Sequence, residues 1–308
     1  MDWITPPAVR SGDKIALVTP ATVVSEKYVI GAEATLRSYG LEPVRMPHFL
    51  CGDDRRFAGD ADGRLEDLLA AWSNPEYKAI YCGRGGYGSV QLISRIPLSL
   101  PRMNPKWVVG FSDVCALHAL SLKTAVLSLH ASMLKHLALY GQDSIANDIL
   151  GILGGKRVNE QEGNIHPLQQ CGTTCGRLIG GNISVIGDLA GTPFDPYANI
   201  GDEPFILLLE DVGESLSRLQ RRLWRLRLAG VMNKAQGIVV GLFTDCHPGL
   251  NFTTPEAMIA DLLEEWGVTC PVAFNFPVGH DDCNVPLVIG ATTTLEVNPA
   301  YCLLSQSF

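Results

Sequence analysis

A serine lies where an apolar run gives way to a helical pattern. The run Val108–Gly110 is typical of a buried strand, and a helix is expected from about Asp113. A serine at a strand-to-helix turn is exposed beside the positive end of the helix, as in a nucleophile elbow. The sequence departs from G-x-S-x-G, because Val114 replaces the second glycine. The alternative is that Ser112 only caps the helix.

A serine nucleophile needs a base, and the base needs an orienting group. Of the seven histidines, His280 lies in a Gly-, Pro- and Asp-rich loop after an apolar run, where catalytic side chains gather on α/β scaffolds. His118 lies in the helix expected just after Ser112 and is interpreted as a packed helix residue. His130, at the end of an apolar run, stays a possible neighbour of the site. The other four lack such a setting (His48, His136, His166 and His247).

Two carboxylates, Glu210 and Asp211, end the apolar run Phe205–Leu209. A carboxylate at the end of a buried strand is costly unless it has a partner, so either could orient the base. Glu214 fits the N-terminal turn of the following helix better.

The segment Cys82–Gly88, CGRGGYG, contains G-x-G-x-x-G after an apolar run. A dinucleotide site would need an acidic residue about 20 positions further on. No Asp or Glu lies between Glu76 and Asp113, and Pro97 cuts the following helix short. A nucleotide-dependent oxidoreductase is therefore disfavoured. Exposed amides in a loop without bulky side chains suit an oxyanion hole instead.

Composition limits the class of protein. The chain has 308 residues, 46% hydrophobic and 18% charged, enough for one or two globular domains. A net charge of -8 argues against nucleic acid as a partner, and no stretch is apolar enough for a membrane span. Nine scattered cysteines favour a reducing cytoplasm. Only Cys171 and Cys175 are close, and no further Cys or His follows at matching spacing, so a metal site is not expected.

Strand-like and helix-like segments alternate in the first half, which predicts a parallel sheet flanked by helices. The expected strands are residues 14–19, 42–46, 79–82 and 107–110, and the expected helices are 28–39, 62–72 and one from about 113.

Residues 151–175 lack periodicity and are predicted to link an N-terminal domain, 1–150, to a C-terminal one, 176–308. Strands are expected at 205–209, 237–241, 271–274 and 293–297, and helices at 215–229 and 255–266. In the first of these helices, leucines at 216, 219, 223 and 226 share one face. A core-facing helix with a solvated basic side is the favoured interpretation, over a surface for nucleic acid or membrane.

Taken together, these residues resemble the LD-carboxypeptidase family of serine peptidases. The resemblance covers nearly the whole chain and is carried by seven motifs in the family's order. They are Ser11–Pro20, Arg56–Gly59, Arg84–Gly88, Gly110–Asp113, Leu178–Asn182, Leu209–Gly213 and Pro277–His280. The family's His-Gly-Pro-Met motif is changed here to His130-Ala-Ser-Met133, and Leu216–Arg221 is also altered.

The resemblance implies a Ser–Glu–His triad formed by Ser112, Glu210 and His280. It also implies an oxyanion hole formed by the amides of Asp113 and Gly86, with Gly85 as the alternative to Gly86. Arg84, beside that loop, is a weak candidate for the substrate carboxylate, and Gly85 for a further substrate contact.

The fold implied is an N-terminal α/β sandwich with a mainly parallel sheet, followed by a mostly β C-terminal domain with a few helices. The activity implied is cytoplasmic release of D-Ala from murein tetrapeptides in cell-wall recycling, without a cofactor or metal, by a homodimer. The alternatives are hydrolysis of a peptide–nucleotide toxin, as in microcin-type immunity, and a non-catalytic ligand-binding protein.

Overall fold

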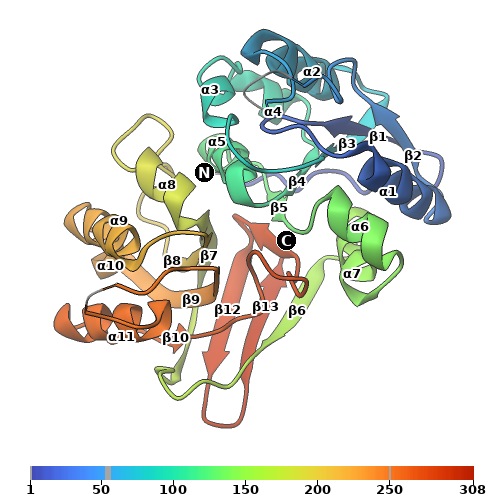
Figure 1. Ribbon diagram of the computed structural model, residues 1–308. Helices are drawn as coiled ribbons and strands as arrows, with labels where there is room; N and C mark the ends of the chain where they lie inside the picture. The colour runs from blue at the N-terminus through green and yellow to red at the C-terminus, as the bar shows by residue number, and fades with distance from the viewer. Residues whose placement is uncertain (1, 53–56, 250) are drawn as a thin grey trace. The chain divides into compact units, whose positions relative to one another are not determined.

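The computed structural model describes residues 2–52, 57–249 and 251–308. Arg56, which begins one of the family motifs, lies outside them. The chain divides into two compact units, each built on its own sheet (Figure 1). Unit 1 comprises Met1–Arg157 and Val285–Val288, and unit 2 comprises Val158–Asn284 and Ile289–Phe308.

Unit 1 contains a six-stranded sheet in the order β11-β5-β4-β3-β1-β2. Neighbouring strands from β2 to β5 run parallel. The near-complete burial of β1, β3 and β4 explains their apolar runs in the sequence, since a parallel sheet is covered on both faces. The strands are β1 (Lys14–Val18), β2 (Glu42–Arg45), β3 (Tyr77–Cys82), β4 (Trp107–Gly110), β5 (Ser128–His130) and β11 (Leu287–Ile289).

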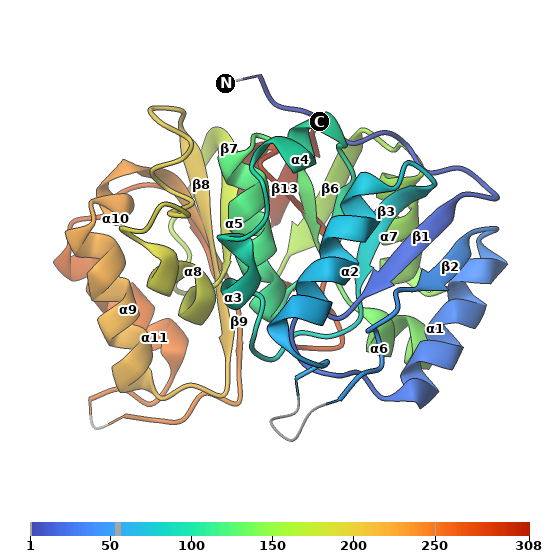
Figure 2. The same cartoon turned by 90° about the horizontal axis from the view of Figure 1, so that it is seen from above.

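Helices cover both faces of this sheet. Figure 2 shows the blue helix α1 beside β1 and β2, whereas α2 and α5 lie on the other face. Gly31 lets α1 approach α6 closely, because a Cβ there would lie only 2.9 Å from the Cβ of Ala138. The helices are α1 (Glu26–Ser38), α2 (Ala61–Ser73), α3 (Val90–Ile93), α4 (Ser99–Met103), α5 (Cys115–Lys123), α6 (Leu134–Tyr140) and α7 (Ser144–Leu153).

Unit 2 contains a seven-stranded mixed sheet in the order β10-β9-β8-β7-β12-β13-β6. The strands from β10 to β7 pair in parallel, and those from β7 to β6 pair antiparallel. The predicted fold class, an α/β protein with a mainly parallel first sheet and a strand-rich C-terminal part, is therefore confirmed. The strands are β6 (Val158–Gly163), β7 (Gly172–Asn182), β8 (Phe205–Val212), β9 (Ala235–Thr244), β10 (Val272–Ala273), β12 (Thr292–Val297) and β13 (Cys302–Ser307).

The helices of unit 2 lie beside the parallel half of its sheet, as Figure 1 shows. On α9 the four leucines of the predicted apolar face are each at most 2% exposed, so the prediction of a core-facing helix is confirmed. The helices are α8 (Ile183–Leu189), α9 (Leu216–Leu228), α10 (Val231–Lys234) and α11 (Pro255–Glu265).

The segment 151–175, predicted as a linker, holds the end of α7, all of β6 and the start of β7. The inward-facing residues of β6 are amides rather than apolar residues. Asn159 donates to Gln306 (3.2 Å) and accepts from Gln161 (2.9 Å), and all three are buried. A strand whose buried face is polar shows no alternation of apolar and polar residues, so β6 could not be predicted from the sequence pattern.

Candidate active site

Ser112 lies at a sharp turn in unit 1. β4 ends at Gly110, and after Phe111 the chain enters the short 3-10 helix η1 (Ser112–Val114) and then α5. Ser112 has a φ of +65°, in the left-handed region that costs a non-glycine residue about 1–2 kcal/mol. Phe111 is the N-cap of η1 and Val114 that of α5, so the alternative of Ser112 as a helix cap is wrong. Backbone strain at a strand-to-helix serine is typical of a nucleophile elbow.

The glycine loop after β3 packs directly against Ser112. A Cβ on Gly85 would lie 3.0 Å from Ser112 Oγ and 3.4 Å from Asp113 N. The Gly85 carbonyl accepts a hydrogen bond from Thr22 N (3.3 Å), in the loop that follows β1. Gly86 has a φ of +111°, and a Cβ there would collide with Thr22 Oγ1. The loop can approach the serine this closely because neither position carries a side chain.

Backbone amides beside Ser112 are available to a bound ligand. Asp113 is the second residue of η1, and the first N–H groups of a helix have no intrahelical acceptor. In the part of the chain that the structure describes, the Gly86 N–H makes no hydrogen bond. The buried Asp113 carboxylate accepts from Ser89 N (2.8 Å) and so ties the turn to the end of the glycine loop.

Arg84 extends from the same loop into solvent. Its guanidinium Nη1 donates to the Val23 carbonyl at 3.3 Å, a weak contact, and the described residues accept from none of its other N–H groups. An exposed guanidinium is suited to meet a carboxylate, but one weak contact with Val23 does not fix its direction.

His118, six residues after Ser112, supports the turn from inside unit 1. It is 1% exposed, with Nε2 at 2.9 Å from the Gly110 carbonyl and Nδ1 at 2.8 Å from Ser128 Oγ. Burial lowers the pKa of His118 to about 3, so the ring is neutral. The sequence-based interpretation of a merely packed helix residue missed these polar contacts.

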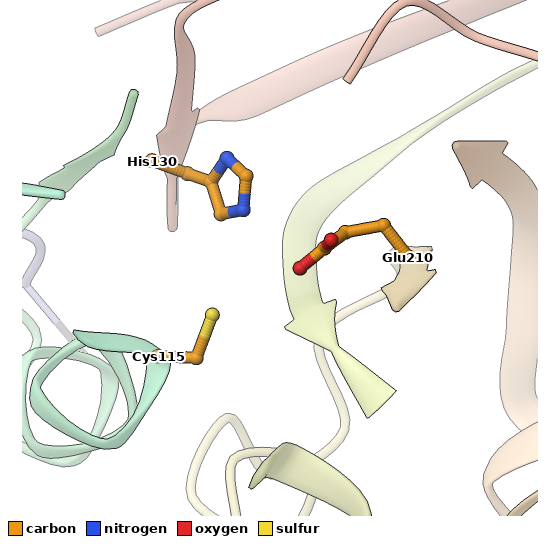
Figure 3. Close-up of side chains that lie close together, drawn as sticks. All are labelled: Cys115, His130 and Glu210. Atoms are coloured by element: carbon orange, nitrogen blue, oxygen red, sulfur yellow. The ribbon is translucent and has the colours of Figure 1, made fainter. Parts of the chain in front are cut away.

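His130 is the last residue of β5 and Cys115 the first of α5. Figure 3 shows the side chains of both. The His130 ring meets Phe111 edge-on, with ring centroids 5.8 Å apart, and lies 6.1 Å from the His118 ring. His130 thus packs against Phe111, the residue before Ser112.

Glu210 and His280 are hydrogen-bonded in unit 2. The distance from His280 Nδ1 to Glu210 Oε2 is 2.7 Å, and the glutamate side chain is fully buried while that of the histidine is 16% exposed. A carboxylate only accepts, so Nδ1 carries the proton and the basic lone pair of the ring lies on the other nitrogen, Nε2. This is the arrangement in which an acid orients a catalytic histidine.

Two glycines allow this pair to form. A Cβ on Gly241 of β9 would lie 2.4 Å from an atom of the His280 loop, so the contact with the Val278 carbonyl requires glycine there. Gly279 has a φ of +138°, and a Cβ there would lie 3.3 Å from Glu210 Oε2. The loop is also held by Asn284, fully buried, whose Oδ1 accepts from Gly279 N at 3.0 Å.

The other two acids near the end of β8 have different partners. Asp211 accepts from Ser184 N (3.0 Å) and Asn182 Nδ2 (3.1 Å) at the start of α8, and burial raises the pKa of this carboxyl. Glu214 forms ion pairs with two arginines of α9, Arg218 (3.7 Å) and Arg222 (3.5 Å). Of the two carboxylates that end the apolar run, Glu210 contacts His280, whereas Asp211 contacts the start of α8.

Comparison with known proteins shows the family to which the chain belongs. The N-terminal domain model of LD-carboxypeptidases matches residues 15–131, and the C-terminal domain model matches residues 175–295. A Synechocystis protein provisionally named a carboxypeptidase is 33% identical over 303 residues, covering 96% of this chain and 95% of its own. The chain belongs to the LD-carboxypeptidase family. The murein tetrapeptide carboxypeptidase of Pseudomonas aeruginosa is 30% identical, covering 92% of this chain and 94% of its own.

Solved structures of LD-carboxypeptidase relatives share the fold. The muramoyltetrapeptide carboxypeptidase of Oxalobacter formigenes has a TM-score of 0.82 and 25% identity, covering 96% of this chain and 99% of its own. A microcin self-immunity protein bound to glutamyl sulfamoyl guanosine has a TM-score of 0.83 with 19% identity, covering 98% of each chain. At that identity the second likeness concerns the fold alone. Among the residues described here, no helix is long and apolar enough to cross a membrane.

Proposed function

We propose that this LD-carboxypeptidase family member is a serine hydrolase that releases the C-terminal D-Ala of murein tetrapeptides during cell-wall recycling. The observation that carries the proposal is the 2.7 Å hydrogen bond between His280 and the fully buried Glu210. A buried carboxylate that meets an imidazole is costly to maintain and is used where a histidine must gain a proton. The strained backbone of Ser112, in the motif Gly110–Asp113, supports the same activity.

In this mechanism His280 Nε2 takes the proton from Ser112 Oγ as the oxygen attacks the carbonyl carbon of the L,D-peptide bond. Glu210 holds the ring in the required tautomer and stabilises the imidazolium that forms. The N–H groups of Asp113 and Gly86 donate to the developing oxyanion, and removal of one such donor typically costs about 3 kcal/mol. His280 then protonates the departing amine of D-Ala, and water hydrolyses the acyl-enzyme. Arg84 is the proposed partner of the free D-Ala carboxylate.

A murein peptide is favoured over a nucleotide-bearing one by two observations. The relative with 30% identity is named for murein tetrapeptides, whereas the immunity proteins are about 20% identical. Binding a base by stacking needs accessible aromatic rings. Of the three aromatic residues between Asn182 and Glu210, Tyr197 is 7% and Phe205 3% exposed, and their rings pack at 6.3 Å within unit 2. Only Phe194 is partly exposed, so this interval offers a base one ring at most.

The test is mass spectrometry of L-Ala-D-Glu-diaminopimelate-D-Ala after incubation with purified protein, with glutamyl sulfamoyl adenosine as a second substrate. Loss of D-Ala from the tetrapeptide is expected, and Ser112→Ala should abolish it while thermal unfolding stays unchanged. Cleavage of the sulfamoyl adenosine alone would favour the immunity activity. Binding of the tetrapeptide without cleavage would favour a non-catalytic protein, and turnover by Ser112→Ala would refute the triad. Gel filtration tests the homodimer expected by resemblance.

A further inference from the structure

The turn that carries Ser112 is held by an internal polar network. Strained backbone persists only where its surroundings fix it, so the φ of +65° at Ser112 needs supporting contacts. After the serine, Val114 N bonds to the Phe111 carbonyl at 3.2 Å. Before it, the Gly110 carbonyl accepts from both His118 Nε2 (2.9 Å) and Ala131 N (3.1 Å).

The chemistry of these partners fixes the direction of each hydrogen bond. A carbonyl oxygen can only accept, so His118 Nε2 carries the ring's proton. Nδ1 is then an acceptor, and the Ser128 hydroxyl must donate to it at 2.8 Å. Ser128 is fully buried and His118 nearly so, and both ring nitrogens have partners. The imidazole is therefore held in one tautomer and one orientation.

We propose that His118 is a positioning residue for the nucleophile. It acts through the Gly110 carbonyl, which belongs to the peptide group that precedes Phe111 and so sets the path of the chain into Ser112. By holding that peptide plane it keeps Ser112 in its strained conformation, with Oγ beside Gly85 and the Asp113 N–H directed away from the helix. The inference rests on the proposed role of Ser112 as nucleophile.

The experiment measures how fast a serine-directed fluorophosphonate labels Ser112, together with kcat and KM for the tetrapeptide. His118→Leu removes the donor to Gly110 and should lower both the labelling rate and kcat by about 100-fold, with KM little changed, because a displacement near 1 Å costs about that much. His118→Gln can place an amide N–H near the position of Nε2 and should recover most of the rate. His118→Asn is too short to reach Gly110 and should stay slow.

The matched control is His136→Leu. His136 is also buried in unit 1 and pairs with Asp143 (2.9 Å) away from the turn. Its loss should lower the melting temperature but leave labelling of Ser112 unchanged. A folded His118→Leu protein that is labelled at the wild-type rate would overturn the proposal. Equal labelling rates for the Gln and Asn variants would also overturn it, and this comparison tests the positioning role if His118→Leu does not fold.

A separate measurement keeps this inference distinct from the proposed function. If the wild-type protein neither reacts with the fluorophosphonate nor cleaves the tetrapeptide, the assignment of Ser112 as nucleophile is wrong. Crystal structures of the wild type and His118→Gln and His118→Asn variants then test the positioning role by itself. A Ser112 φ that turns negative in the Asn variant and stays positive in the Gln variant supports it, and a positive φ in both overturns it.

Discussion

Replacing Gly85 with alanine places one methyl group against the proposed nucleophile. The φ of Gly85 lies outside the left-handed region, so alanine can adopt the backbone conformation without strain. The new Cβ would lie 2.9 Å from Ser112 Cβ and 3.0 Å from Ser112 Oγ. The substitution is therefore a local test of how closely the glycine loop must approach the serine.

The size of the effect follows from these distances. Carbon atoms in contact are about 3.5–4.0 Å apart, so the serine and the loop must separate by roughly 0.6–1.1 Å. A misplacement of about 1 Å costs about 100-fold in rate, or about 2.7 kcal/mol of transition-state stabilisation. Stability should also fall, because the overlap with Ser112 costs about 1–3 kcal/mol, more than the roughly 0.4–1 kcal/mol that Gly→Ala contributes through the unfolded chain.

The assay is D-Ala release under kcat/KM conditions, beside thermal unfolding of the same samples. Gly52→Ala is the matched control, since a Cβ at Gly52 would have no described residue within 4 Å and its φ is also outside the left-handed region. We expect about 100-fold loss for Gly85→Ala and none for Gly52→Ala. A folded Gly85→Ala protein with wild-type turnover would show that the loop does not need this proximity, and the oxyanion-hole role of Gly86 would fall with it.

Three further changes test other contacts. Asn284→Ala leaves the Gly279 N–H without its acceptor and should lower the free energy of unfolding by about 1–3 kcal/mol in urea titrations. Glu210→Gln should lower kcat by about 10⁴-fold with an unchanged circular dichroism spectrum, since the acid no longer fixes the His280 tautomer. Neutral His118, with its pKa lowered to about 3 from 6.5, contributes stability above pH 6.5 that is lost as pH falls toward 3. Urea unfolding at pH 7 and pH 4 should therefore show that the free energy of unfolding falls more for the wild type than for His118→Gln when the pH is lowered.

The elements that carry a one-dimensional apolar signal could be predicted from the sequence. β1, β3, β4 and β8 are continuous apolar runs because parallel strands are buried on both faces. The leucine face of α9 could also be predicted, because the other side of the helix meets solvent and carries polar residues. Such patterns depend only on burial along a single element, which the sequence records directly.

Contacts between distant residues were the part that the sequence could not supply. His118 is surrounded in sequence by buried apolar residues, and its partners Gly110 and Ser128 lie eight and ten residues away. Val285–Val288 belong to unit 1 although the preceding residues belong to unit 2, a return of the chain that no local pattern marks. Both features exist only once the sheet has brought separate segments together.

The two adjacent acids of β8 have different partners because of the backbone geometry, although their residue types are similar. Glu210 and Asp211 are adjacent, both are buried, and their residue types are nearly equivalent. Successive side chains of a strand point to opposite faces, so the two carboxylates enter different environments. Glu210 meets Gly279 and His280, while Asp211 meets the first residues of α8. Only the face shared with the His280 loop gives a carboxylate an imidazole to orient, and the irregular pairing of β8 with β9 between Leu209 and Asp211 lies at this point of the strand.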